Sequence, residues 1–272
     1  MLSPELINRF YSNWEGAPSW PRLWAKQFRI RTSGNTFITL NRKRRRLNSP
    51  SLRGFCVDYA PVNVYMSVIN WLMPERVTDK HSSRAAHPTG GEYVVDVDSY
   101  LGYRKHSHSL TGGVCEGCIE GSKQLTERLL DNISENYQDI RVVFSGKSGF
   151  HIHVLDFDVR DWTYYSDDDP LRSHEVARFK YTKHVSEAVK GSFDRPHFIL
   201  SSDVLRIITV PDSLNGETGL ICTLLGSPFD FRELTIPEIV EMAGSARGRT
   251  VGVNWVSLDK VQGARRQLVL EV

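Results

Sequence analysis

The chain has 272 residues, of which 40% are hydrophobic, 10% aromatic and 24% charged. These proportions are typical of a soluble globular protein and exclude a collagen-like, low-complexity or disordered chain. With 34 basic and 32 acidic residues the formal charge is +2, so a polyanionic ligand would have to bind a local basic patch.

The sequence predicts neither a membrane-spanning segment nor a secretory signal. No run of about 18 apolar residues is present, so we expect no contact with a membrane. The first residues lack the charged start and apolar core of a secretory signal. Four cysteines are too few for a disulfide framework and favour a reducing compartment. We therefore expect a cytoplasmic protein with a single domain over residues 1–272.

The first hundred residues contain a basic run, an apolar stretch and a strand. Residues 42–46 are the one concentrated basic run, which is either a solvated turn or a phosphate-contacting patch. An apolar stripe over 62–73 predicts a helix that Pro74 ends. The β-branched, alternating segment 92–98 predicts a strand.

The rest of the chain mixes helices and strands. Further helices are predicted over 121–137, 173–189 and 234–244, and further strands over 204–213, 253–258 and 265–272. Residues 140–159 predict a hairpin of two strands joined by a tight glycine turn. Because the strands and helices do not alternate regularly, the pattern indicates the α+β fold class.

Two carboxylates stand at the end of the strand predicted over 92–98. Asp96 and Asp98 are two positions apart, so both side chains point to one face of the strand. Like charges repel, and a divalent cation is the usual reason to hold them together. Mg²⁺ or Mn²⁺ between such carboxylates and phosphates is the arrangement of phosphoryl transfer. The alternative is a strand end whose polar residues continue into a loop.

The turn of the predicted hairpin has the composition of an anion-binding site. Two glycines in SGKSG free the backbone, and the amides, a hydroxyl and the ammonium of Lys147 form a cradle that His151 would face. The spacing is not that of a Walker loop, and no helix follows. The alternative is an ordinary hairpin turn followed by a hydrogen-bonded histidine.

Four metal-binding side chains occur within 13 residues. His106, His108, Cys115 and Cys118 satisfy a tetrahedral, structural Zn²⁺ site. The competing interpretation is a reducible Cys-x-x-Cys pair, which usually opens a helix in a thioredoxin-like unit. We favour zinc because the redox interpretation leaves the two histidines unexplained.

In this order the motifs resemble the small, catalytic subunit of archaeal and eukaryotic DNA primases, a branch of the primase–polymerase superfamily. The matching segments are YVVDVD, the His-x-His and Cys-x-x-Cys segment after it, FSGKSGFHIHV and SSDVLRIITVPDSLNGETGL. PVNVYMSVINWLMPE also resembles a helix that the family has ahead of the carboxylates. The resemblance spans about residues 10–240.

The resemblance implies a fold and an activity. The expected fold is a mixed sheet core with flanking helices, a zinc knuckle at 104–120 and a small helical insertion at about 160–195. The expected enzyme is a DNA-dependent nucleotidyltransferase, a DNA primase that makes short primers on single-stranded DNA from nucleoside triphosphates. A primase large subunit is the implied partner in a heterodimer, and the nucleoid or replisome is the implied location.

The resemblance also implies residue roles, which are taken over position by position. Asp96 and Asp98 would hold two catalytic Mg²⁺ or Mn²⁺ ions. The triphosphate would be bound by Ser145, Lys147, Ser148 and His151. Zinc would be bound by His106, His108, Cys115 and Cys118.

This sequence departs from the family at four positions. Ser148 and Thr209 stand where the family usually has a basic residue, and Glu217 stands where it has a lysine. Each lost charge-assisted contact is worth roughly 1.5–3 kcal/mol. Either other cations replace these residues, with Arg206 and the 42–46 run as candidates, or catalysis is weakened.

The fourth departure concerns the third catalytic carboxylate, which falls on His197. Asp194 or Asp203 could supply the missing acid, and we select Asp203 as the third catalytic residue. The alternative for Asp203 is an ordinary turn or capping residue.

Two other functions follow from the same features. The four departures suggest a primase-like subunit that binds DNA or a partner without polymerising. A zinc-dependent hydrolase is the weaker idea, since it needs an open metal position and the knuckle already offers four ligands. We rank the enzyme first, because Asp96, Asp98 and His151 all remain in place.

Overall fold

The computed structural model describes residues 2–17, 20–42, 46–79, 82–97, 114–188, 198–200, 202–245, 253–257 and 266–270. The helices are α1 (Pro4–Ser12), α2 (Ser49–Tyr59), α3 (Glu116–Ile133), α4 (Pro170–Ala188), α5 (Pro228–Glu233) and α6 (Ile236–Ser245). Short 3-10 turns cover Leu23–Ala25, Leu40–Arg42, Pro74–Arg76, Ser82–Ala86 and Val159–Asp161. None of the helices within these residues is long and apolar enough to cross a membrane.

Strands β1 to β7 cover Phe28–Arg31, Phe37–Thr39, Asn63–Ser67, Ile69–Trp71, Pro88–Gly91, Tyr93–Val97 and Val114–Cys115. Strands β8 to β14 cover Ile140–Phe144, Phe150–Val154, Phe198–Leu200, Ile207–Thr209, Thr223–Gly226, Val253–Ser257 and Arg266–Leu270. The two larger sheets have the strand orders β10-β6-β9-β8-β12 and β11-β3-β1-β2. This mixture confirms the predicted α+β class.

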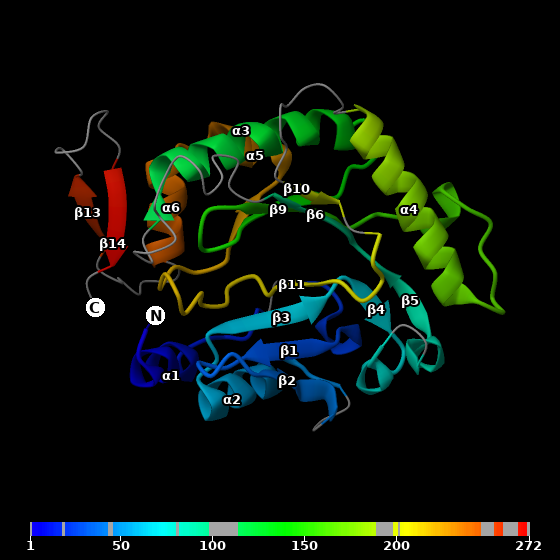
Figure 1. Ribbon diagram of the computed structural model, residues 1–272, viewed down its shortest axis with the longest axis horizontal. Coiled ribbons are helices and arrows are strands. Elements are labelled where there is room, and N and C mark those ends of the chain that lie inside the picture. Colours follow the sequence, from blue (N-terminus) through cyan, green and yellow to red (C-terminus); the bar gives the residue numbers. More distant parts are fainter. Residues whose placement is uncertain are drawn as a thin grey trace.

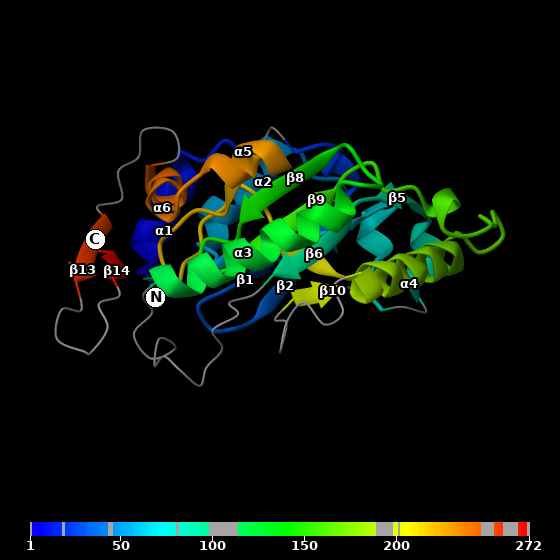
Figure 2. The same cartoon turned by 90° about the horizontal axis from the view of Figure 1, so that it is seen from above.

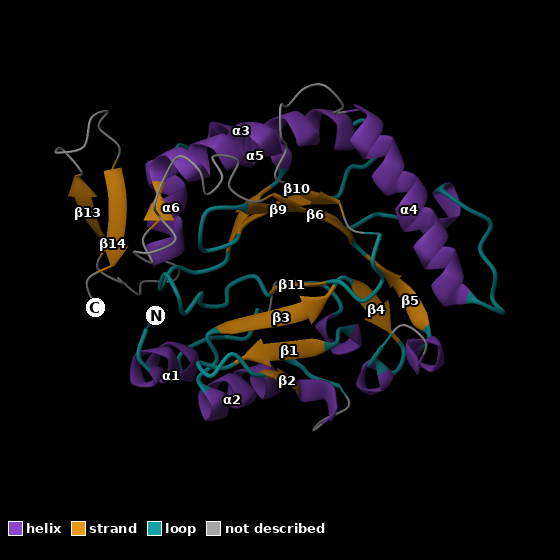
Figure 3. Cartoon of the chain, in the orientation of Figure 1, coloured by secondary structure: helices purple, strands orange, loops and turns teal. Residues whose placement is uncertain are grey.

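The two sheets form the middle of the molecule. Helices α3, α5 and α6 cover the outer side of the five-stranded sheet, and α4 continues along its far end (Figure 1). The four-stranded sheet lies on the other side of the five-stranded sheet, with α1 and α2 beyond it (Figure 3). Two apolar cores result, one under the helices and one around the four-stranded sheet.

Strand β6 shows how the fold separates apolar from polar side chains. Tyr93, Val95 and Val97 alternate into the core under the helices. Val94 belongs to the core of the four-stranded sheet. Because strand side chains alternate, Asp96 shares the face of Val94 and points toward the four-stranded sheet. The predicted strand is therefore confirmed, and its carboxylate lies on the side between the two sheets.

The helix predicted over 62–73 is wrong, and so is the family helix expected there. The segment forms β3 and β4, and β3 pairs with β1 and β11. Val64 and Met66 are buried while Tyr65 is half-buried between them, which is the period of a strand. Short apolar runs fit both periods, and the β-branched and aromatic residues of this run favour the strand.

Most other predicted elements are confirmed. Strands β8 and β9 form the hairpin, and α3 overlaps the helix predicted over 121–137 but begins five residues earlier, at Glu116, and ends four residues earlier, at Ile133. Helix α4 lies in the segment assigned to the helical insertion. Helix α1, which Ser3 caps, and helix α2, which opens with an Asn48–Ser51 capping box, were not predicted.

Candidate active site

Asp96 lies on β6, which is paired on one side with β9 and on the other with β10. Asp96 pairs with His151 on β9 and with Ile199 on β10. Its side chain is 19% exposed, so it borders the buried sheet yet can be reached from outside. Asp98, its expected companion, lies outside the described residues. Among the described residues no group of three or more His, Cys, Asp or Glu is arranged to hold a metal ion.

His151 stands beside this carboxylate and is neutral. Its Nε2 lies 3.6 Å from Asp96 Oδ1, beyond hydrogen-bond distance. Its Nδ1 is buried and has no hydrogen-bond partner among the described residues. Burial lowers the pKa of His151 to about 4, against the opposing attraction of Asp96. At neutral pH the imidazole is therefore uncharged and able to accept or donate one hydrogen bond.

Arg206 provides the positive charge next to Asp96. Its guanidinium donates a hydrogen bond to Asp96 Oδ2 from the turn just before β11. From the sequence, Arg206 is expected only as a replacement cation. Because the two residues are 110 positions apart, no local sequence pattern predicts this contact.

Asp203 lies in the same turn and accepts hydrogen bonds from the backbone of that turn. Its side chain accepts a hydrogen bond from the Leu205 amide at 2.9 Å, and its carbonyl accepts one from the Arg206 amide at 3.2 Å. The residue is exposed. These contacts agree with the turn-residue alternative, because Asp side chains commonly bond the amide two residues later. Its assignment as the third catalytic acid stays a prediction.

The SGKSG turn joins β8 to β9 as predicted. The Ser145 amide donates to the Gly149 carbonyl at 2.9 Å, and the Ser145 hydroxyl accepts from the Gly149 amide at 3.2 Å. Gly146 has φ +79°, and a Cβ there would lie 3.2–3.3 Å from the 215–222 loop. Lys147 is exposed, while Ser148 is half-buried.

The PDSLNGETG segment packs directly on this turn. The Thr218 hydroxyl donates to the Gly146 carbonyl at 2.6 Å. Asn215 holds the loop in shape, since its side chain accepts from the Glu217 amide at 3.0 Å. These contacts bring together two motifs that are far apart in the sequence. Lys147 in one motif donates a hydrogen bond to Glu217 in the other, 70 positions later.

Glu217 lies between two cations. Lys147 Nζ is 2.9 Å from Glu217 Oε2, and Arg31 donates to the other oxygen. Partial burial alone would raise the pKa of Glu217, but hydrogen bonds and charge from Arg31 and Lys147 outweigh it and lower the pKa to about 2. Arg31 comes from β1 and was not predicted. It restores a positive charge next to the position where the family has a lysine.

The predicted zinc ligands are only partly described. His106 and His108 lie outside the described residues. Cys115 ends β7, and Cys118 is buried in the first turn of α3. The Cys-x-x-Cys segment therefore does open a helix, which the redox alternative expects. Strand β7, however, pairs antiparallel with β14 and is not part of a thioredoxin-like unit.

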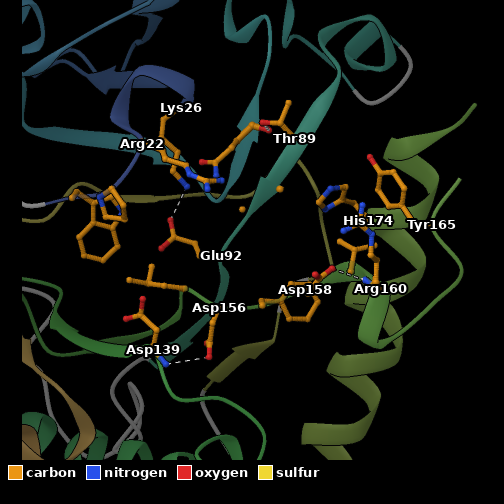
Figure 4. A pocket seen from close by; sticks show the side chains of 18 of the residues that line it. Arg22, Lys26, Thr89, Glu92, Asp139, Asp156, Asp158, Arg160, Tyr165 and His174 are labelled. Atoms are coloured by element: carbon orange, nitrogen blue, oxygen red, sulfur yellow. Dashed lines mark hydrogen bonds and ion pairs between the residues drawn. The ribbon is translucent and has the colours of Figure 1, made fainter. Parts of the chain in front are cut away.

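A separate cleft of about 600 Å³ lies at the opposite end of β6, where the strand begins (Figure 4). Its charged lining residues are Glu92, Asp139, Asp156, Asp158, Asp167, Arg22, Lys26 and Arg160. Acidic groups outnumber basic ones, five to three. Because a triphosphate is strongly anionic, the Asp96 side of the sheet suits a nucleotide better than this cleft.

Buried charges stabilise the floor of this cleft. Lys26 Nζ lies 2.8 Å from Glu92 Oε1, and His153 Nδ1 lies 2.8 Å from Glu92 Oε2. All three side chains are almost fully buried. Burial alone would raise the pKa of Glu92, but Lys26 and His153 outweigh it and lower the pKa to about 2. This network joins the residues just before β1 and β6 to strand β9.

The fold is similar to that of one known polymerase domain. The polymerase domain of Mycobacterium tuberculosis ligase D, solved in complex with DNA, superposes with a TM-score of 0.50. The match covers 91% of this chain and 90% of that chain at 11% sequence identity. In fold, the chain is therefore like this polymerase domain.

Sequence comparison points to a particular group of proteins. The chain is 29% identical to the DNA primase small subunit PriS of Pyrobaculum calidifontis over 226 residues, covering 72% of this chain and 69% of the relative. It is 29% identical over 153 residues to the PriS subunit of Thermococcus sibiricus, covering 54% of this chain and 39% of the relative. No family model matches the chain. The resemblance to primase small subunits is confirmed.

Proposed function

We propose that the chain is a DNA-dependent nucleotidyltransferase that makes short primers on single-stranded DNA. The observation that carries the proposal is the convergence of Asp96, His151 and Arg206 on one face of the sheet, with the SGKSG turn leading directly into the strand of His151. The enzyme class agrees with the primase small subunits among its relatives.

Among the described residues, Asp96 is suited to bind a divalent cation. Asp96 offers a hard oxygen ligand, the type that Mg²⁺ and Mn²⁺ prefer, on an accessible strand end. Asp98 would be the second ligand on the same face. When bound, such a cation would neutralise charge on the phosphates during phosphoryl transfer.

The chain's own side chains would bind and orient the nucleotide. Lys147 and the amides of the SGKSG turn would hold the phosphates, and neutral His151 would donate one hydrogen bond to them. Arg206 would move from Asp96 to a phosphate when the carboxylate takes up a cation. Positioning and charge stabilisation are most of what phosphoryl transfer requires from a protein.

The departures from the family change the source of positive charge. Glu217 removes a cation, but it holds Arg31 and Lys147 at the same place, so the three groups together keep a net positive charge. Arg206 lies three positions before Thr209 in the sequence. It supplies a guanidinium near the same site. Replacement of the missing cations therefore supports the enzyme over the non-polymerising subunit.

We further propose a structural zinc ion bound by His106, His108, Cys115 and Cys118. Metal analysis of the purified chain should find about one zinc per chain, and Cys115→Ser should lose it together with thermal stability. Cys56→Ser is the matched control, because Cys56 lies buried on α2. Zinc-free wild-type protein with an oxidisable Cys115–Cys118 pair would establish the redox alternative.

A primase large subunit as partner, and a location at the nucleoid or replisome, are proposed from the family resemblance. The experiment that tests the activity is nucleotide incorporation on a primed single-stranded template with Mg²⁺ or Mn²⁺, using labelled ribo- and deoxynucleotides side by side. Measurable DNA binding with no incorporation would instead establish the non-polymerising subunit.

A further inference from the structure

The four-stranded sheet has an outer face made by two rows of paired residues. Thr209, Tyr65, Arg29 and Thr39 are direct cross-strand neighbours across β11, β3, β1 and β2. Asn63, Arg31 and Phe37 form the next row. The alternate residues, such as Phe28, Ile30, Val64 and Met66, point into the core. The outer face therefore combines aromatic, basic and hydroxyl side chains.

Two aromatic rings meet on this face. Phe37 is 54% exposed, so its ring is open to solvent. Strand β1 separates the strands of Phe37 and Tyr65, yet their ring centroids lie only 6.0 Å apart, inclined by 35°. The rings lean toward each other across β1 and form an open aromatic surface.

Unneutralised positive charge lies beside these rings. Arg29 is half-buried, and its Nε has no hydrogen-bond partner among the described residues. Burial, and then the like charge of exposed Arg42, lowers the pKa of the Arg29 guanidinium. Two arginines close enough to repel each other, with no described hydrogen bond to the buried Nε of Arg29, are suited to an anion from outside.

The face is continuous with the candidate active site. Thr209 belongs to β11, which begins one residue after Arg206, the partner of Asp96. Arg31 of the second row holds Glu217, and Glu217 in turn holds Lys147 of the SGKSG turn. A ligand that left the site over Tyr65 would reach Phe37 on the edge strand β2. Four strands at a spacing of about 4.8 Å span about 14 Å.

We propose that this face, defined by Arg29, Tyr65 and Phe37, binds the unpaired template strand as it leaves the active site. Bases stack on Phe37 and Tyr65, and a phosphate pairs with Arg29 and Arg42. Stacking requires unpaired bases, so the ligand is single-stranded, and at a rise of 3.4 Å per nucleotide the face holds about four. The assignment of this strand as template rests on the proposed function.

The first test is binding of a fluorescein-labelled oligothymidylate, measured by anisotropy without nucleotide. Phe37→Ala and Tyr65→Ala should each weaken binding about tenfold and leave its salt dependence unchanged, because they remove stacking only. Arg29→Gln should weaken binding and lower the slope of log Kd against log salt by about 0.7, because it removes one phosphate contact.

Matched controls lie elsewhere on the surface. Phe229→Ala removes a 73% exposed phenylalanine from α5, on the side of the molecule opposite β2 in Figure 2. Arg172→Ala removes an exposed arginine from α4. Both controls should bind as the wild type does, and melting curves should show that all five variants fold. Equal binding by the folded Phe37, Tyr65 and Arg29 variants and the wild type would overturn the proposal.

A second readout locates the bases themselves. The fluorescence of 2-aminopurine is quenched when the base stacks, so a series of templates with the probe at successive positions reports contact with Phe37. Quenching should fall in Phe37→Ala at template positions within about four nucleotides of the primer end. Because neither assay requires incorporation, an inactive enzyme that passes both would contradict the proposed function alone. An active enzyme that fails both would contradict this inference alone.

Discussion

The guanidinium of Arg206 hydrogen-bonds to the carboxylate of Asp96, 110 positions earlier in the chain. A cation bound to Asp96 would compete with Arg206 for the same oxygens. Arg206→Ala should therefore strengthen Mn²⁺ binding but weaken nucleotide binding, each by about tenfold, since a charge-assisted hydrogen bond is worth about 1.5–3 kcal/mol. Calorimetric titration of each ligand separates the two effects, with Arg160→Ala as control. A change of the same sign in both titrations would contradict the exchange of partners.

Glu217 restrains two cations that would otherwise face the triphosphate. Glu217→Gln removes the negative charge but keeps the size of the side chain, so Arg31 and Lys147 gain freedom to pair with phosphates. We expect KM for the nucleotide to fall about tenfold, which corresponds to the lower end of about 1.5–3 kcal/mol for one charge-assisted contact. Steady-state incorporation should be compared with Glu120→Gln, an exposed change on α3. A raised KM would mean that Glu217 positions these cations rather than restraining them.

The buried pair of Lys26 and Glu92 should be costly to break. Glu92→Gln leaves the Lys26 ammonium without a counter-charge in a buried site, which typically destabilises a protein by about 3–5 kcal/mol. Urea denaturation measures the loss. Asp131→Asn, which breaks an exposed pair with Arg232, should cost less than about 1 kcal/mol. Equal losses in the two variants would show that the buried pair is not a stabilising element.

Acid should destabilise the chain through His174. Burial, followed by the charge of Arg178, lowers the pKa of His174 to about 3. An unfolded histidine binds a proton below about pH 6.5, whereas folded His174 does not until about pH 3, so stability falls as pH falls through this window. Between pH 7 and 5.5 this one group should remove about 1 kcal/mol.

The test is the urea midpoint of wild type and His174→Gln at the two pH values. The glutamine variant should lose about 1 kcal/mol less between them, while His151, whose pKa is also lowered, remains in both proteins. The same acid sensitivity in both proteins would show that folding does not lower the pKa of His174.

Local patterns predicted those parts of the site that lie on one strand or one turn. The alternation of β6 placed Asp96 on the polar face, and two glycines marked the turn before His151. The contacts between motifs could not be predicted, because Arg31 and Glu217 are 186 positions apart. The helix predicted over 62–73 is wrong because a short apolar run fits either period, and here the β-branched and aromatic residues together with the pairing of β3 with β1 and β11 favour the strand.

The central claim is that Asp96 belongs to a nucleotide-polymerising site. The most direct test is incorporation of labelled nucleotides on a primed single-stranded template by wild type, Asp96→Asn and the Asp96→Ala, Asp98→Ala double variant. The account predicts Mg²⁺- or Mn²⁺-dependent incorporation that falls by at least about 100-fold in both variants, while their melting curves and DNA binding stay close to wild type. Undiminished incorporation by a verified, folded double variant would contradict it.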